Sequence, residues 1–167
     1  MKNSLILILF LFFAFLWSCT NPFAPRLDTD LGSNGSLISS QKTIEGLFQN
    51  FQYSYTFKDT TIYGGLLNPN YSFIYRDYEL SVDVSWGRDE DMRVTNGLFQ
   101  NSQRLDLIWN NIVSMSSDST NIIRSFNLTI TFNPTDIIQV DGRVNLQLEK
   151  NDKGVWKIVN WIDESNF

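Results

Sequence analysis

A two-residue alternation of apolar and polar side chains in the second half of the chain is the strongest constraint on its fold. The alternating apolar residues are Leu105, Leu107 and Trp109, then Phe126, Leu128, Ile130 and Phe132, then Val144, Leu146 and Leu148. Short turn-forming segments rich in Ser, Asn, Asp and Gly separate these runs, and such connections join antiparallel neighbours. The pattern therefore predicts an antiparallel sheet with one face in a core.

The last predicted strand breaks this rule. Trp156 and Ile158 share one parity, whereas Val155, Val159 and Trp161 share the other. Either both faces of this strand are covered, or a β-bulge changes the parity within it.

Helical periodicity precedes the strands. Large side chains recur at intervals of three and four residues, at Ile44, Leu47, Phe48, Phe51 and Tyr55. This stripe predicts an amphipathic helix that Ser39 or Ser40 caps. A second, short helix is expected from Thr60 to Leu67, capped by Asp59, with Ile62, Leu66 and Leu67 as its buried side, and ended by Asn68-Pro69-Asn70.

Two strands and a third helix are expected before the alternating runs. Residues 71–75 and 80–86 alternate as strands do. Asp89, Glu90 and Asp91 place negative charge where a helix N-terminus favours it, and Met92, Leu98 and Phe99 give that helix an apolar side. The macrodipole explains these acidic residues without a metal site.

The N-terminus reads as a targeting signal. A basic start with Lys2 precedes an apolar run from Leu5 to Trp17, and Leu16, Ser18 and the chain's only cysteine, Cys19, follow the lipobox pattern. This stretch resembles the signal of bacterial lipoproteins, which implies acyl chains such as palmitate on Cys19. A secretory signal with an incidental Cys19, or an uncleaved anchor, are the alternatives. The predicted organisation is a signal peptide over residues 1–18, a lipidated flexible tether over 19–38, and one domain over 39–167.

The predicted lipoprotein signal and the net charge together indicate partners and location. The formal charge of −5 argues against nucleic acid as a partner. The same negative charge gives no attraction to anionic lipids, so membrane attachment would depend on the lipid on Cys19. Thr20 follows that cysteine in place of the Asp that retains some lipoproteins at the inner membrane, which favours the outer membrane, facing the periplasm.

The order of elements from Ser40 to Glu164 is similar to the nuclear-transport-factor-2-like superfamily, which includes SnoaL-like polyketide cyclases and ketosteroid isomerases. The resemblance rests on the aromatic helix with Asp59, on Trp86 with Leu98-Phe99, on Asp141-Gly142-Arg143, and on the ending Gly154 to Asp163. It implies an α+β, cone-shaped fold in which N-terminal helices pack on a curved antiparallel sheet around a pocket. The main alternative is a lipocalin-like or cystatin-like sheet, although lipocalins lack the first helical pair and cystatins lack the third helix.

Catalysis has few candidates in this sequence. The chain contains no histidine, which excludes His bases and His-ligated metals. A trio of one Tyr (Tyr53 or Tyr55) with Asp83 and Asp106 is formally available, but no spacing singles it out. No catalytic residue, cofactor or metal is therefore predicted.

Aromatic side chains are the remaining candidates for a binding site. The predicted pocket residues are Tyr55, Tyr75, Trp86, Trp109, Trp156 and Trp161. They suit a small apolar ligand, although a small core also needs large side chains. Three functions remain open: a non-catalytic domain that binds such a ligand or a partner protein, an isomerase- or cyclase-like enzyme, and a structural part of an envelope complex, with self-pairing as a homodimer.

Overall fold

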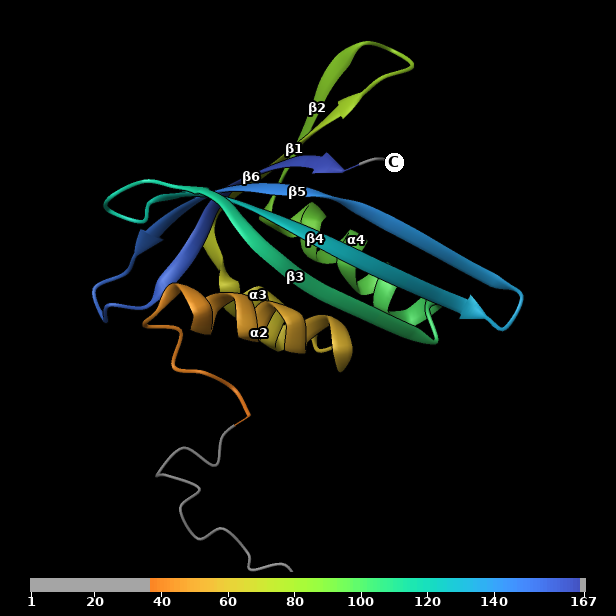
Figure 1. Cartoon of the computed structure of the whole chain (residues 1–167), viewed down its shortest axis with the longest axis horizontal. Coiled ribbons are helices and arrows are strands. Elements are labelled where there is room, and N and C mark those ends of the chain that lie inside the picture. Colours follow the sequence, from red (N-terminus) through yellow and green to blue (C-terminus); the bar gives the residue numbers. More distant parts are fainter. Residues whose placement is uncertain (1–36, 166–167) are drawn as a thin grey trace, which may run out of the picture. The chain divides into compact units, whose positions relative to one another are not determined.

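The computed structural model describes residues 37–165. Three helices and six strands follow one another along this part of the chain. They are α2 (Ile44–Thr56), α3 (Thr60–Leu66), β1 (Leu67–Asp77), β2 (Val82–Gly87), α4 (Arg88–Asn101), β3 (Arg104–Met115), β4 (Asn121–Asn133), β5 (Asp136–Lys150) and β6 (Trp156–Ser165). The helices cover one face of a curved sheet, as Figure 1 shows. This α+β arrangement confirms the predicted fold class.

The sheet has the strand order β2-β1-β6-β5-β4-β3. Neighbours joined by short turns are antiparallel, as predicted. β1 and β6 differ, because they pair in parallel. Their pairing needs no short turn, since β2 to β5 and α4 lie between them in the chain, so the argument from short connections does not apply to this pair.

Helix α2 buries the stripe that its sequence predicts, because Leu47, Phe48, Phe51 and Tyr55 all lie in the core. Its N-cap is Thr43, whose side chain accepts a hydrogen bond from the backbone N–H of Gly46. The predicted cap at Ser39 or Ser40 is therefore wrong: the helix begins later than the polar run suggested.

Helix α3 begins at the predicted cap. The Asp59 carboxylate accepts hydrogen bonds from the backbone N–H groups of Thr61 and Ile62. The helix ends at Leu66, and β1 already includes Pro69. Proline cannot donate to a ladder, and it lies where the pairing of β1 with β6 is interrupted.

A β-bulge resolves the parity of β6. Gln147 pairs with Asn160, but the next residue of β5, Leu148, pairs with Ile158. Val159 is thus the extra residue, and the residues on either side of it can face the core. Trp156, Ile158 and Trp161 are accordingly all buried.

Candidate functional site

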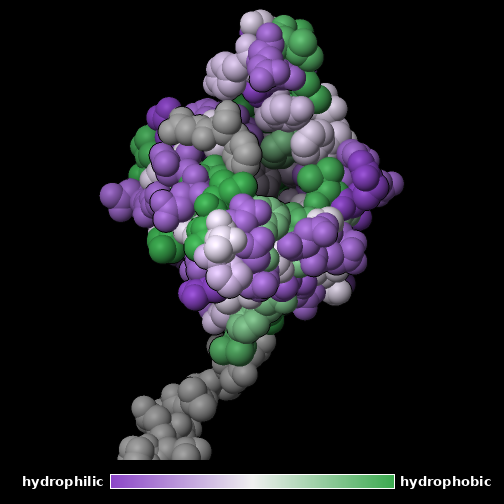
Figure 2. Space-filling model, turned by 90° about the vertical axis from the view of Figure 1, so that its right-hand side faces the viewer, coloured by the Kyte–Doolittle hydropathy of each residue, from purple (hydrophilic) through white to green (hydrophobic). Residues whose placement is uncertain are grey.

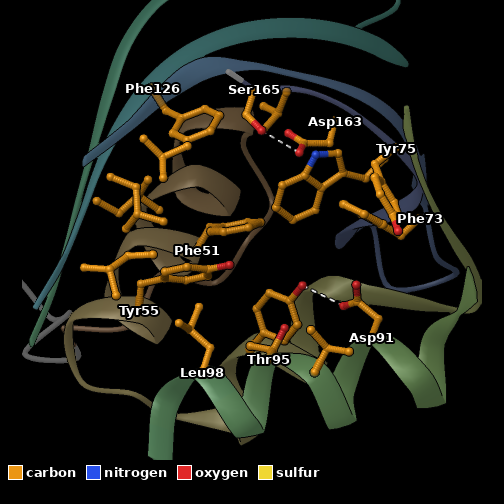
Figure 3. A pocket seen from close by; sticks show the side chains of 18 of the residues that line it. Phe51, Tyr55, Phe73, Tyr75, Asp91, Thr95, Leu98, Phe126, Asp163 and Ser165 are labelled. Atoms are coloured by element: carbon orange, nitrogen blue, oxygen red, sulfur yellow. Dashed lines mark hydrogen bonds between the residues drawn. The ribbon is translucent and has the colours of Figure 1, made fainter. Parts of the chain in front are cut away.

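The curved sheet and the helices line an open cavity of about 520 Å³. Most of its wall is aromatic or aliphatic side chain from α2, α4 and the concave face of the sheet. Figure 2 shows this face of the molecule hollowed, with hydrophobic residues at the hollow and hydrophilic ones further out. Figure 3 shows the side chains that point into the cavity.

The structure brings five of the six predicted pocket residues to this cavity. Tyr55 comes from α2, Tyr75 from β1, Trp86 from β2, Trp109 from β3 and Trp161 from β6. The sequence did not indicate that these five residues are neighbours, since each lies on a different helix or strand.

Trp156 is placed elsewhere. It is the first residue of β6, whereas the cavity meets that strand at Trp161, Asp163 and Ser165. Its ring is buried under the Lys150 ammonium, 4.7 Å from the ring centroid. Its backbone N–H donates to the Gln41 carbonyl. Trp156 therefore fills the core, and its aromatic character alone did not distinguish these roles.

Phe51 is the centre of the aromatic wall. Its ring centroid lies between 5.3 and 5.7 Å from those of Tyr55, Tyr63, Trp109 and Trp161. Three of these contacts are edge-to-face, the geometry that ring quadrupoles favour. One side chain of α2 thus fixes rings from α3, β3 and β6.

Asp91 is the buried carboxylate of the site, and the sequence analysis did not identify its role. It accepts hydrogen bonds from Tyr63 Oη (2.7 Å), Trp86 Nε1 (3.0 Å) and Tyr71 Oη (3.4 Å). Burial raises the pKa of Asp91 above the ordinary range, while the three donors oppose that rise. The sequence carried one indication of this role, the four-residue spacing of Asp91 and Thr95. This spacing places both residues on the same side of α4, which is the buried side.

The neighbouring acids of Asp91 remain outside the cavity. Asp89 is exposed, and Glu90 pairs with Arg93 on the surface of the helix. Within residues 37–165, no group of three or more His, Cys, Asp or Glu side chains is arranged to hold a metal ion.

Asp163 is the second carboxylate of the cavity. It accepts a hydrogen bond from Ser165 Oγ at 2.7 Å, drawn in Figure 3. Burial is the main cause that raises the pKa of Asp163. The pKa of the Tyr55 hydroxyl is raised by burial and then by the charges of Asp91 and Asp163, so this phenol remains protonated.

One polar atom of the wall lacks a partner. The indole Nε1 of Trp161 is buried and has no hydrogen bond within the described chain. A buried donor without a partner costs free energy, so this indole makes the wall less stable than a fully hydrogen-bonded one.

The catalytic trio considered from the sequence does not assemble. Asp83 pairs with Arg76 on the exposed β1–β2 ladder, and Asp106 pairs with Arg104 on the surface of β3. Tyr53 stacks on Phe57 instead of lining the cavity. The polar groups inside include Tyr55, Asp91 and Asp163, which the sequence did not group together.

Comparison with known proteins identifies the fold. No protein-family model matches the sequence, and no curated protein is significantly similar to it. The structure is similar to a provisionally named scytalone dehydratase from Novosphingobium aromaticivorans, with a TM-score of 0.63 and 15% identity over 74% of this chain and 82% of that one.

Two further solved structures support the same fold. AusH from Aspergillus nidulans has a TM-score of 0.59 and 12% identity over 74% of this chain and 86% of that one. An NTF2-like protein of unknown function from Shewanella baltica has a TM-score of 0.53 and 12% identity over 72% and 89%. Residues 37–165 therefore have the nuclear-transport-factor-2-like fold, as predicted. At identities this low, the structural similarity defines the architecture only, and the function has to be inferred from the residues of the site.

Proposed function

We propose that this chain is a binding protein for a small, apolar, ring-bearing ligand, which it holds in the cavity between α2, α4 and the sheet. The observation that carries the proposal is the cavity itself: about 520 Å³, walled by rings from several elements, with a few polar groups inside. Ligand sites of this size, about 300–1,000 Å³, commonly combine apolar walls with a few orienting polar groups.

Tryptophan signals test this proposal directly. In the full chain in detergent micelles, labelled with 5-fluorotryptophan, a neutral aromatic probe such as 2-naphthol should shift the ¹⁹F resonances of Trp86, Trp109 and Trp161. The Trp156 resonance should remain in place, because its ring lies outside the cavity. Equal shifts of all tryptophan signals, or no shift at saturating probe, would refute binding in the cavity.

A cavity-filling variant provides the matched control. Val140→Phe adds volume to the wall and should weaken probe binding about tenfold or more, because the added ring occupies the space of the ligand. Val113→Phe makes the same change on β3, where the side chain is 54% exposed, and should leave binding unchanged.

An acid–base enzyme is the second candidate. Asp163 favours it, because a carboxylate with a raised pKa inside a cavity can act as a general base. Asp91 is less suited to this role, since three donors already occupy it. Turnover of a defined ring-bearing substrate that Asp163→Asn abolishes would support the enzyme over the binding protein.

Membrane attachment through Cys19 is a further part of the proposal. The lipobox pattern of Leu16, Ser18 and Cys19 supports it, and these residues lie outside the described part of the chain. Between residues 37 and 165, no helix has the length and apolarity needed to cross a bilayer. A lipid on Cys19 would hold the chain at the periplasmic side of the outer membrane, with the tether over residues 19–38 and the folded domain over 39–167.

Metabolic labelling tests the anchor. An alkyne analogue of palmitate should label the chain in bacterial cells, and Cys19→Ser should abolish the label while Thr20→Ala retains it. Density-gradient separation of the two membranes should place the labelled chain with the outer one. A label that survives Cys19→Ser would contradict the anchor.

A further inference from the structure

The charge of the cavity is one-sided. Its lining contains two carboxylates, Asp91 and Asp163, and among the residues that the structure describes no Lys or Arg contributes to the wall. A buried negative charge is costly unless a partner or several donors compensate it. The two carboxylates differ in how far the protein provides that compensation.

Asp91 is compensated by the protein. The two Tyr hydroxyls and the Trp86 indole donate to it from three different elements, α3, β1 and β2. It is 4% exposed, so little of it remains available to a ligand. Asp91 therefore serves the architecture of the wall.

Asp163 is compensated only in part. Within residues 37–165 it forms no ion pair, and its hydrogen bonds come from a single residue, Ser165, through the side-chain hydroxyl and the backbone N–H. A carboxylate has about four acceptor sites, so about half of its capacity is open. Its neighbour Glu164, by contrast, pairs with Arg143.

Aromatic residues lie next to Asp163 in the sheet and line the same cavity. In the parallel ladder of β1 and β6, Tyr75 is the direct partner of Asp163 and Phe73 is the partner of Trp161. Trp86 from β2 stacks on Phe73, with 4.6 Å between the ring centroids. Figure 3 shows Phe73, Tyr75 and Asp163 at one end of the cavity.

Rings that flank an unpaired carboxylate match one kind of ligand group. A ring face attracts a cation at distances up to about 6 Å from its centroid, and quaternary ammonium groups are held by such aromatic cages. We propose that the cavity binds a lipophilic organic cation, an amine or quaternary ammonium with an apolar ring or chain, whose charged group lies between Asp163 and the rings of Phe73, Tyr75 and Trp86. This inference rests on the proposed function and adds the charge of the ligand to it.

The orientation of the ligand follows from the same geometry. Its charged group lies at the Asp163 end, and its apolar part extends along Phe51, Leu128 and Val140. An anionic ligand would meet two carboxylates with no cation in the described wall to balance it. A neutral ligand would leave the open acceptor sites of Asp163 without a charged partner.

Three matched probes test the proposal. They are 4-phenylbutyl-trimethylammonium, its neutral isostere with a tert-butyl group in place of the ammonium, and 4-phenylbutane-sulfonate. Calorimetric titration uses the full chain in detergent micelles, with micelles alone as the blank. We expect the cation to bind about tenfold or more tightly than the neutral isostere, and the sulfonate to bind most weakly.

Substitution of the carboxylate identifies the source of the preference. Asp163→Asn should reduce the ratio of cation to neutral affinity to about threefold or less, chiefly by weakening the binding of the cation. Asp152→Asn, in the exposed turn between β5 and β6, should keep the full ratio. A variant that fails to fold would be recognised by loss of neutral binding, and Trp86→Leu then provides a second test, since it removes a ring of the cage and should also lower the ratio.

The outcomes separate this inference from the proposed function. If neither the cation nor the isostere binds, the cavity is not a ligand site and the proposed function fails. If the neutral isostere binds as tightly as the cation, or if Asp163→Asn keeps the ratio, the cavity binds ligands but the cation proposal is overturned.

Discussion

Tyr63 Oη donates a 2.7 Å hydrogen bond to Asp91 Oδ2, which joins the short helix α3 to the first turn of α4 inside the domain. The phenol is 1% exposed and the carboxylate 4% exposed, so the pair is shielded from water. Burial is the main cause that raises the pKa of Tyr63, and Asp91 adds to it by charge and hydrogen bonding. The phenol therefore remains a donor, and this bond fixes one wall of the cavity.

Removal of this donor should destabilise the fold. Tyr63→Phe keeps the ring but leaves Asp91 with two donors, and we expect a loss of about 2 kcal/mol in the free energy of unfolding, typical of a buried hydrogen bond to a charged group. Urea denaturation measures it. Tyr78→Phe removes the hydroxyl of a residue that is 74% exposed and should change stability by less than about 0.5 kcal/mol. Equal effects of the two substitutions would contradict a structural role for the pair.

Truncation of the central ring should be more damaging. Phe51→Ala removes a side chain that contacts four other rings, and we expect a cost of about 3–5 kcal/mol. Phe57→Ala, at an exposed position just after α2, is the matched control with little expected effect. If Phe51→Ala does not fold, Phe51→Leu allows a milder measurement, with a cost of about 1–1.5 kcal/mol. A cost equal to that of Phe57→Ala would show that Phe51 does not organise the wall.

Asp163 should make stability depend on pH. Its pKa is raised in the folded chain, so the folded state binds the proton more tightly than the unfolded state does. The stabilisation that comes from this tighter proton binding is fully present below the ordinary Asp pKa of 3.8. It is lost as the pH rises through the raised pKa of the folded chain. At neutral pH the ionised Asp163 therefore opposes folding.

A non-ionising variant tests this sign. Asp163→Asn should unfold at a higher temperature than the unmodified chain at pH 7, and the difference should shrink as the pH falls towards 4. Thermal unfolding followed by circular dichroism at several pH values measures it, with Asp152→Asn as the control. A variant that is less stable at pH 7 would mean that Asp163 has a compensating partner when ionised.

Two glycines should respond in opposite directions to the same substitution. At Gly142 an added Cβ would lie 2.4 Å from Ser165 Cα and 3.0 Å from the Glu164 carbonyl oxygen, so β5 and β6 would have to separate. We expect Gly142→Ala to cost about 1–3 kcal/mol. At Gly97, within α4, an added Cβ meets no atom within 4 Å, and Gly97→Ala should stabilise the helix by about 0.5–1 kcal/mol. Denaturant unfolding distinguishes them, and a stable Gly142→Ala variant would contradict the close approach of the two strands.

The sequence determined the elements of this domain. The stripe on α2, the Asp59 cap of α3 and the alternating runs of β3, β4 and β5 are all visible in it. Each signal is local, because a side chain's spacing along the chain decides which face of its own helix or strand it occupies. The sequence also indicated that β6 either has both faces covered or contains a bulge, because the parity of its apolar residues changes within the strand.

Only the tertiary structure decided which faces meet. The sequence indicated only that Asp91 is a charge at the start of a helix. It could not indicate the donors Tyr63, Tyr71 and Trp86, since they come from three other elements. Trp161 and Trp156 share β6, yet only Trp161 lines the cavity. The parallel pairing of β1 with β6, which places Tyr75 beside Asp163, depends on contacts between distant parts of the chain. Periodicity carries no information about such contacts, because the free energy that selects them comes from burial shared among many elements at once.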